Sequence, residues 1–185
     1  MPVHTTTGNT LAFRPLTESD LPLLAEWIAR PHVARWWYEP VGSAAVRAEY
    51  LPCVHGTEPT HALVAQLDGI EVGFAQWYRW ADYPEHAGKL GADEDEAGID
   101  YLVADPARCS QGFGTRLVGA LIEQVRLAWP AVAGLVVDPE QGNRASCRVL
   151  EKNGFHLVRV VQLEAEGHPV GPTAVYRRRF SAQPR

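Results

Sequence analysis

Cysteine is scarce in this chain, with only Cys53, Cys109 and Cys147 among 185 residues. Their number is odd and their spacings are wide, so they suit neither a disulfide framework nor a Cys-x-x-Cys metal site. The seven histidines also lack the His-x-x-x-His spacing of a zinc site. We therefore expect reduced thiols and no metal, and we expect His32 and His61 to pack or hydrogen bond.

Long hydrophobic runs are missing as well. No stretch approaches the roughly 18 uninterrupted apolar residues that a membrane-spanning helix needs, and the polar segment Met1–Thr10 lacks the pattern of a signal peptide. A share of 46% apolar and 21% charged residues is typical of a globular chain with a buried core. These features predict a single domain over residues 1–185, located in the cytoplasm.

Positive charge is in short supply, because 17 Lys and Arg residues face 22 Asp and Glu residues, for a net charge of -5. This balance argues against nucleic acid and anionic membranes as partners and favours cationic molecules, although mild acidity also serves solubility alone. No segment indicates an obligate protein partner.

The hydrophobic periodicity predicts an α/β (mixed α+β) fold. An antiparallel first half leads into a strand-helix-strand unit, which argues for a mixed sheet of about six or seven strands with helices on both faces. Ala81–Ala97 is predicted to be a long acidic loop, and a turn is predicted around Gly167 and Gly171. The predicted strands are Leu11–Arg14, His61–Leu67, Glu71–Trp80, Ile99–Ala104, Val132–Val137, Phe155–Leu163 and Ala174–Phe180. The predicted helices carry Leu21 to Ile28, Ala44 to Val54, Phe113 to the residue before Pro130, and Asn143 to Lys152.

A glycine-spaced turn, Gln111-Gly112-Phe113-Gly114-Thr115, joins a strand to the clearest helix of the sequence. Unpaired N–H groups at a helix N-terminus bind anions, and glycines let the backbone approach a pyrophosphate closely. The turn does not match the dinucleotide-binding fingerprint, because Leu117 stands where that motif requires its third glycine. It does not match a P-loop either, because no lysine precedes Thr115. No Gly-x-Ser-x-Gly elbow of a serine hydrolase occurs either.

A second informative segment follows in Val136-Val137-Asp138-Pro139, Asn143-Arg144-Ala145-Ser146 and Leu150–Phe155. In this order, the two segments resemble the GNAT N-acetyltransferase superfamily. Its aminoglycoside 6'-N-acetyltransferases show the nearest similarity, over about Leu11 to Val175. Their matching stretches include Pro31-His32-Val33, Trp36-Trp37, Tyr50-Leu51-Pro52, Gly73–Gln76 and Gly98-Ile99-Asp100.

The resemblance implies acetyl transfer from acetyl-CoA (coenzyme A) to a primary amine, with the coenzyme in a cleft between the central strands. The pyrophosphate would lie on the glycine turn, and the pantetheine arm would pair with strand backbone and with an asparagine that is equally suited to capping a helix. The residues so assigned to the cofactor are Tyr101, Leu102, Val103, Gln111, Gly112, Phe113, Gly114, Thr115 and Asn143.

Asp100 is the predicted general base. An ammonium group cannot attack a thioester, so a base must remove its proton directly or through water. Alternation along the strand sends Asp100, Leu102 and Ala104 to one face and Ile99, Tyr101 and Val103 to the other. The alternative is an aspartate bonded to loop backbone near a strand end.

A cationic small-molecule amine is the expected acceptor, with an aminoglycoside implied by the resemblance. The residues predicted to contact it are Trp36, Trp37, Gln76, Tyr78 and Asp138. The rings of Trp77 and Trp80 and the acidic run Asp93–Glu96 could also attract a cation. Most tryptophans are core residues, however, and Asp138-Pro139 is also ordinary turn chemistry.

Leu150 departs from the resembling enzymes, which carry at this position a tyrosine that protonates the departing thiolate. The thiolate then leaves unaided, or it takes a proton from water or from Ser146, or the acceptor is a different amine. A lysine-derived siderophore precursor, a polyamine and a protein amine are the enzymatic alternatives. A non-catalytic acyl-CoA sensor is a further one, against which Asp100 argues.

Overall fold

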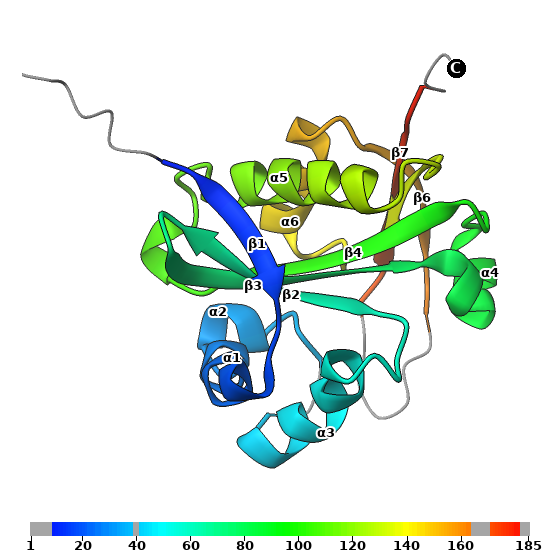
Figure 1. The fold of residues 1–185 in the computed structure, drawn as a ribbon. Helices are drawn as coiled ribbons and strands as arrows, with labels where there is room; N and C mark the ends of the chain where they lie inside the picture. The colour runs from blue at the N-terminus through cyan, green and yellow to red at the C-terminus, as the bar shows by residue number, and fades with distance from the viewer. Residues whose placement is uncertain (1–8, 39–40, 164–170, 182–185) are drawn as a thin grey trace, which may run out of the picture.

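Seven strands form one sheet in the computed structural model, which describes residues 9–38, 41–163 and 171–181 (Figure 1). The strand order is β1-β2-β3-β4-β5-β7-β6, and every neighbouring pair is antiparallel except β4 with β5. The strands are β1 (Leu11–Pro15), β2 (His61–Leu67), β3 (Ile70–Arg79), β4 (Glu96–Val103), β5 (Gly134–Val137), β6 (His156–Val161) and β7 (Thr173–Arg179).

Helices cover both faces of this sheet (Figure 1). One face carries α1 (Leu21–Ile28), α2 (Pro31–Ala34) and α3 (Ser43–Val54), and the other carries α5 (Phe113–Ala128) and α6 (Arg144–Lys152). A further short helix, α4 (Pro84–Leu90), lies near the β6–β7 end of the sheet (Figure 1). The prediction of a mixed sheet of six or seven strands with helices on both faces is therefore confirmed. No described helix is both long and apolar enough to cross a membrane.

The apolar spacing of α5 explains its place in the core. Leu117, Leu121 and Val125 recur at helical intervals, and each is buried against the sheet. On the opposite face, Leu24 and Ile28 of α1 pack in a second core. Burial on both faces makes the central strands rigid supports for whatever their ends carry.

The parallel pair β4–β5 is short. Only Glu96 and Ala97 of β4 pair with β5, and beyond Ala97 the two strands part. The Ala104 N–H bonds Val72 of β3, and alternate residues of a strand direct their N–H and C=O groups to the same side. Those of Ile99, Tyr101 and Val103 consequently point away from β3, toward the side of β5. A cavity lined by residues of both β4 and β5 lies there, so the central strands flank a cleft.

The predicted acidic loop Ala81–Ala97 is wrong over most of its length. It contains α4, which begins with Pro84 at its first position and ends at Gly91 in the left-handed conformation, with φ of 66°. Ala87 and Leu90 are buried among Trp80 and strands β5 and β7. With only two buried apolar residues, this helix gives a weak periodic signal and depends on tertiary packing.

Two carboxylates of the acidic run, Asp93 and Glu96, are paired with arginines and are not available to attract a cation. Asp93 pairs with Arg179 at 2.6 Å, and Glu96, whose side chain is 0% exposed, pairs with Arg177 at 3.0 Å. These contacts tie the start of β4 to β7. The expectation that Asp93–Glu96 contributes charge to acceptor binding is therefore wrong for these two carboxylates.

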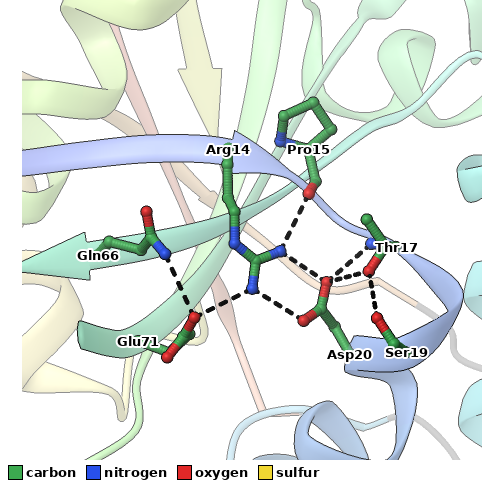
Figure 2. Close-up of polar contacts among 7 residues, drawn as sticks. All are labelled: Arg14, Pro15, Thr17, Ser19, Asp20, Gln66 and Glu71. Carbon is green, nitrogen blue, oxygen red and sulfur yellow. Dashed lines mark hydrogen bonds and ion pairs between the residues drawn. The ribbon is translucent and has the colours of Figure 1, made fainter. Parts of the chain in front are cut away.

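A separate ionic network fixes the other edge of the sheet, where Arg14 of β1 lies between two carboxylates (Figure 2). Its guanidinium donates to both Asp20 oxygens, at 2.6 and 2.8 Å, and to Glu71 at 3.2 Å. Gln66 also donates to Glu71, at 3.2 Å. The Arg14 hydrogen bonds hold the pKa of Asp20 well below its usual range. This network connects β1, the turn before α1 and the β2–β3 hairpin.

Strand limits differ from the predicted ones by a few residues. β4 begins at Glu96 rather than Ile99, and β6 ends at Val161 rather than Leu163. The predicted turn around Gly167 and Gly171 lies outside the described residues, except for Gly171 itself.

Candidate active site

Two adjoining cavities lie where β4 and β5 part, and they share His86 and Asp100. The first, the β4–β5 cavity, has a volume of about 420 Å³ and the second, the α3 cavity, about 530 Å³. The β4–β5 cavity is lined by Trp36, Trp37, Tyr38, His86, Lys89, Ile99, Asp100, Tyr101, Val137, Asp138, Pro139, Glu140, Asn143, Ser146, Leu163 and Thr173. The α3 cavity is lined by Ala48, Glu49, Tyr50, Pro52, Cys53, Glu58, Thr60, Gln76, Tyr78, Trp80, Tyr83, His86 and Asp100.

Asp100 stands at the junction of these cavities. It is directly opposite Gln76 of β3 in the strand register, and the Gln76 Nε2 donates to Asp100 Oδ2 at 2.9 Å. Because of the alternation along β4, the side chain faces the α1–α3 side, as Leu102 and Ala104 do. The predicted faces of this strand are confirmed, and the geometry brings the predicted Asp100 and Gln76 together.

Tyr78 lies on the same face, two residues beyond Gln76. Its ring covers Gly98, where any Cβ would collide with the ring carbons, so the glycine is required for this approach. Burial, and secondly the charges of Asp100 and Asp138, raise the pKa of Tyr78 well above its usual value. The phenol therefore keeps its proton at neutral pH and can act as a hydrogen-bond donor.

Asp138 follows the end of β5 and lies across the gap from β4. Its Oδ2 is 2.9 Å from Nε2 of His86 on α4, and its side chain is 18% exposed. The His86 ring is stacked on Trp80, with centroids 5.5 Å apart and planes inclined by 13°. The hydrogen bond with Asp138 raises the pKa of His86. Sequence reasoning missed His86, because it sits in the segment predicted to be a loop.

A hydroxyl pair lines the β4–β5 cavity from the other side of the sheet. Tyr101 Oη and Ser146 Oγ are 2.8 Å apart, and burial raises the pKa of Tyr101. Leu150, one helical turn beyond Ser146, is completely buried in the core. The cavity thus passes between the strands, with hydroxyls on the α5–α6 side and carboxylates on the opposite side.

Asn143 opens α6 and also lines the β4–β5 cavity. Its Oδ1 accepts the Ser146 N–H at 3.1 Å, which is the helix-capping role. Helix capping uses only the side-chain oxygen of Asn143. The side-chain NH2 group can therefore also donate hydrogen bonds to a ligand in the cavity.

The glycine turn begins α5 outside both cavities. Gly112 adopts φ of 78°, which favours glycine, and Arg116 N–H bonds the Gly112 carbonyl. The N–H groups of Phe113, Gly114 and Thr115 precede this bond, in the helix turn that has no intrahelical acceptors. The Phe113 side chain is buried, and the Gln111 side chain donates to the Ala107 carbonyl at 2.7 Å.

The three β4 residues assigned to the cofactor differ in which of their groups are available to a ligand in the cleft. The Leu102 side chain is buried in the core, and the Val103 carbonyl is bonded by His32 Nε2 at 2.9 Å. Tyr101 has both its backbone groups and its phenol on the cleft side.

Aromatic residues divide between cavity and core. Trp36 and Trp37 both line the β4–β5 cavity, and Trp37 Nε1 donates to Tyr50 Oη at 3.2 Å. Trp77 is only 3% exposed in the core and stacks on His61, with centroids 4.0 Å apart. The hydrogen-bonding and packing roles predicted for His32 and His61 are confirmed. The described residues contain no cluster of three or more groups suited to a metal ion.

The cavities are strongly acidic. Their linings include five carboxylates, from Glu49, Glu58, Asp100, Asp138 and Glu140. Among the described lining residues, Lys89 is the one lysine or arginine. A cleft lined by charge of one sign concentrates ligands of the opposite sign, so this arrangement favours a cationic ligand.

Comparison with known proteins agrees with this geometry. The acetyltransferase (GNAT) domain matches residues 17–163. The aminoglycoside N(6')-acetyltransferase type 1 of Klebsiella pneumoniae is 33% identical over 156 residues, which cover 83% of this chain and 77% of that protein. The lysine N-acyltransferase MbtK of Mycobacterium tuberculosis is 27% identical over 136 residues, 74% of this chain and 64% of that protein.

Solved structures extend the similarity to three dimensions. The aminoglycoside acetyltransferase AAC(6')-Ib in complex with coenzyme A and kanamycin has a TM-score of 0.75 and 32% identity, over 92% of this chain and 95% of that chain. The same enzyme in complex with coenzyme A gives a TM-score of 0.76 and 31% identity, over 92% and 95% of the two chains. In sequence and in fold, the chain belongs to the GNAT acetyltransferase family.

Proposed function

We propose that this protein transfers the acetyl group of acetyl-CoA to the 6'-amine of an aminoglycoside. The observation that carries the proposal is the place of Asp100, at the junction of an acidic cavity and a cleft between parted strands. The similarity to enzymes that bind coenzyme A and kanamycin supports this choice of substrates.

The cleft fits a pantetheine arm. The N–H and C=O groups of Ile99 and Tyr101 point into it without a β5 partner, so an amide-containing chain can pair with them as an added strand would. The first-turn N–H groups of α5, at Phe113, Gly114 and Thr115, would hold the pyrophosphate. Acetyl-CoA supplies an acyl group that is already activated as a thioester.

Asp100 would act as the general base. It accepts a proton from the substrate ammonium, directly or through one water, which frees the nitrogen lone pair for attack on the acyl carbon. Gln76 holds one carboxylate oxygen of Asp100 in place. As the carbon–nitrogen bond forms, the nitrogen releases its second proton to water, and the carbon–sulfur bond breaks so that the sulfur leaves with its electron pair.

The departing sulfur needs a proton, which we assign to Ser146. Its hydroxyl can donate while Tyr101 Oη, 2.8 Å away, donates to Ser146 in turn. The raised pKa of Tyr101 keeps this phenol protonated until the transfer. The pair would replace the tyrosine expected at position 150, where the buried Leu150 has no proton to give.

The acceptor would occupy the α3 cavity and extend past Asp100 into the carboxylate side of the adjoining β4–β5 cavity, where Asp138 lies. Carboxylates of Glu49 and Glu58 line the α3 cavity and suit the further ammonium groups of an aminoglycoside. Acetylation removes one positive charge, which weakens binding of such a compound to RNA.

We place the activity in a single cytoplasmic domain. One sheet contains every described strand, and acetyl-CoA is a substrate of intracellular metabolism.

The test is acceptor specificity, measured as release of free coenzyme A thiol from acetyl-CoA. Kanamycin should be turned over, and NMR of the product should place the acetyl group on the 6' nitrogen. A lysine derivative and spermidine are the comparison acceptors. Turnover of the lysine derivative without turnover of any aminoglycoside would refute the substrate assignment, and binding of acetyl-CoA without any transfer would identify a sensor.

A further inference from the structure

His86 is the one imidazole shared by both cavities among the described residues. It reaches Asp138 from α4, with Nε2 and Oδ2 2.9 Å apart, and its ring lies flat against Trp80. The histidine side chain is 44% exposed and the aspartate 18%, so the histidine faces the open part of the cavity. The pair spans 52 residues of sequence and exists only because α4 folds against the end of β5.

We propose that His86 is a specificity-determining residue, which competes with an ammonium group of the acceptor for the carboxylate of Asp138. The inference rests on the proposed function in that the acceptor is a cationic amine. When His86 is protonated, its charge neutralises Asp138 and the cavity attracts a cation less. When His86 is neutral, Asp138 presents its full negative charge to an acceptor ammonium.

The charges around His86 come from every element beside it. Asp138 and Glu140 follow β5, Asp100 lies on β4, and Glu85 and Lys89 are on the same helix as His86. The hydrogen bond to Asp138 raises the pKa of His86 most, Asp100 raises it further, and burial and Lys89 lower it. In the α3 cavity, Glu58 is already hydrogen bonded by Tyr83 at 2.8 Å.

Competition between His86 and the acceptor for Asp138 predicts the direction in which acceptor affinity changes with pH. The hydrogen bond to Asp138 raises the pKa of His86, so wherever the imidazole is protonated an acceptor must displace a proton in order to bind next to Asp138. Acceptor affinity therefore increases as pH rises through the pKa of His86. By linkage, a bound acceptor must lower that pKa by the same free energy.

Steady-state kinetics across pH 6 to 8.5, with kanamycin as the acceptor, test the proposal. The KM for kanamycin should fall with rising pH in the wild type, by about fivefold more than in His86→Gln, which donates to Asp138 but does not titrate. His86→Phe keeps a ring against Trp80 and leaves Asp138 unbonded, so its KM should be low throughout the range. The titration of kanamycin itself is common to all variants and cancels in the comparison.

The matched control is His55→Gln. His55 forms another histidine–carboxylate pair, with Glu18 at 2.7 Å, outside both cavities. This variant should keep the wild-type pH dependence. A pH dependence of KM that is the same in His86→Gln as in the wild type would overturn the proposal.

A second measurement is independent of turnover. NMR titration of the His86 imidazole should give a higher pKa in the wild type than in Asp138→Asn, and kanamycin should lower it in the wild type. An unchanged pKa in Asp138→Asn would overturn the proposal even if kanamycin is acetylated. If kanamycin is not an acceptor, the difference between wild type and Asp138→Asn still tests the pair, and a lysine derivative that is turned over replaces kanamycin.

Discussion

Carboxylates at two places in this molecule are held by partners of different kinds. At the β1 edge, Asp20 and Glu71 bind the guanidinium of Arg14, a group that stays protonated at any physiological pH (Figure 2). The start of β4 is similar, because Glu96 is paired with Arg177 and Arg179. These charges are cancelled permanently.

The cleft follows the opposite pattern. Asp100 is held by the neutral amide of Gln76, and Asp138 by the titratable imidazole of His86. Such partners orient a carboxylate without permanently cancelling its charge. The contrast teaches that carboxylates paired with arginine stabilise the fold, whereas those given weaker partners remain able to accept a proton or bind a cation.

Removing Arg177, the partner of the buried Glu96, should have the largest effect on stability. Arg177→Met leaves the fully buried Glu96 with its weaker Arg179 contact at 3.4 Å, and it should cost about 3 kcal/mol of the free energy of unfolding. Urea denaturation measures this value. Arg179→Met removes a half-exposed partner and should cost less than about 1 kcal/mol. Equal losses in the two variants would contradict the distinction.

Asp100→Asn should test the other class of carboxylate. We expect kcat to fall by about 10² or more, as is usual for loss of a general base, with little change in stability. Calorimetry should show unchanged affinity for acetyl-CoA. A nearly wild-type rate alongside intact cofactor binding would show that Asp100 is not the base.

Ser146→Ala and Tyr101→Phe should reduce kcat less, by about tenfold each, because a thiolate can also leave without general-acid help. The effects should not add in the double variant, since both hydroxyls serve one proton transfer. Thermal denaturation serves as the folding control. Additive losses would indicate separate roles for the two hydroxyls.

Acid should weaken the Arg14 network by a smaller amount. Because the folded pKa of Asp20 is lowered, its contribution to stability is complete above its ordinary pKa near 4 and is lost as pH falls further toward the folded value. Asp20→Asn should lose roughly 1–2 kcal/mol at pH 7 and show a shallower decline in acid. Thermal denaturation between pH 2 and 7 measures both, and Glu85→Gln, in the exposed pair with Lys89, should have less effect.

Much of the fold was predictable from residues that act locally. The spacing of Leu117, Leu121 and Val125 defines α5, and alternation along β4 places Asp100 correctly. The Asp-Gly turn between β2 and β3 likewise marks the hairpin that brings Gln76 opposite Asp100.

The site was less predictable where it depends on distant packing. α4 is held by contacts with β5 and β7 rather than by its own periodicity, so neither the helix nor the pairing of His86 with Asp138 follows from local sequence. The acidic run looked available for substrate because its arginine partners lie more than 80 residues later. The Pro84 start and the Gly91 stop were the available signals for the missed helix.

The brevity of the β4–β5 pairing has a mechanical consequence. Because β4 and β5 pair over only two residue pairs, the sheet consists of two parts, β1–β4 and β5–β7, which few backbone hydrogen bonds connect. The side chains of α5 share one core cluster with Ile99 of the first part and Leu135 of the second, so this helix connects the two parts. The width of the cleft between β4 and β5 is then controlled by the packing of α5 rather than by hydrogen bonds between the two strands.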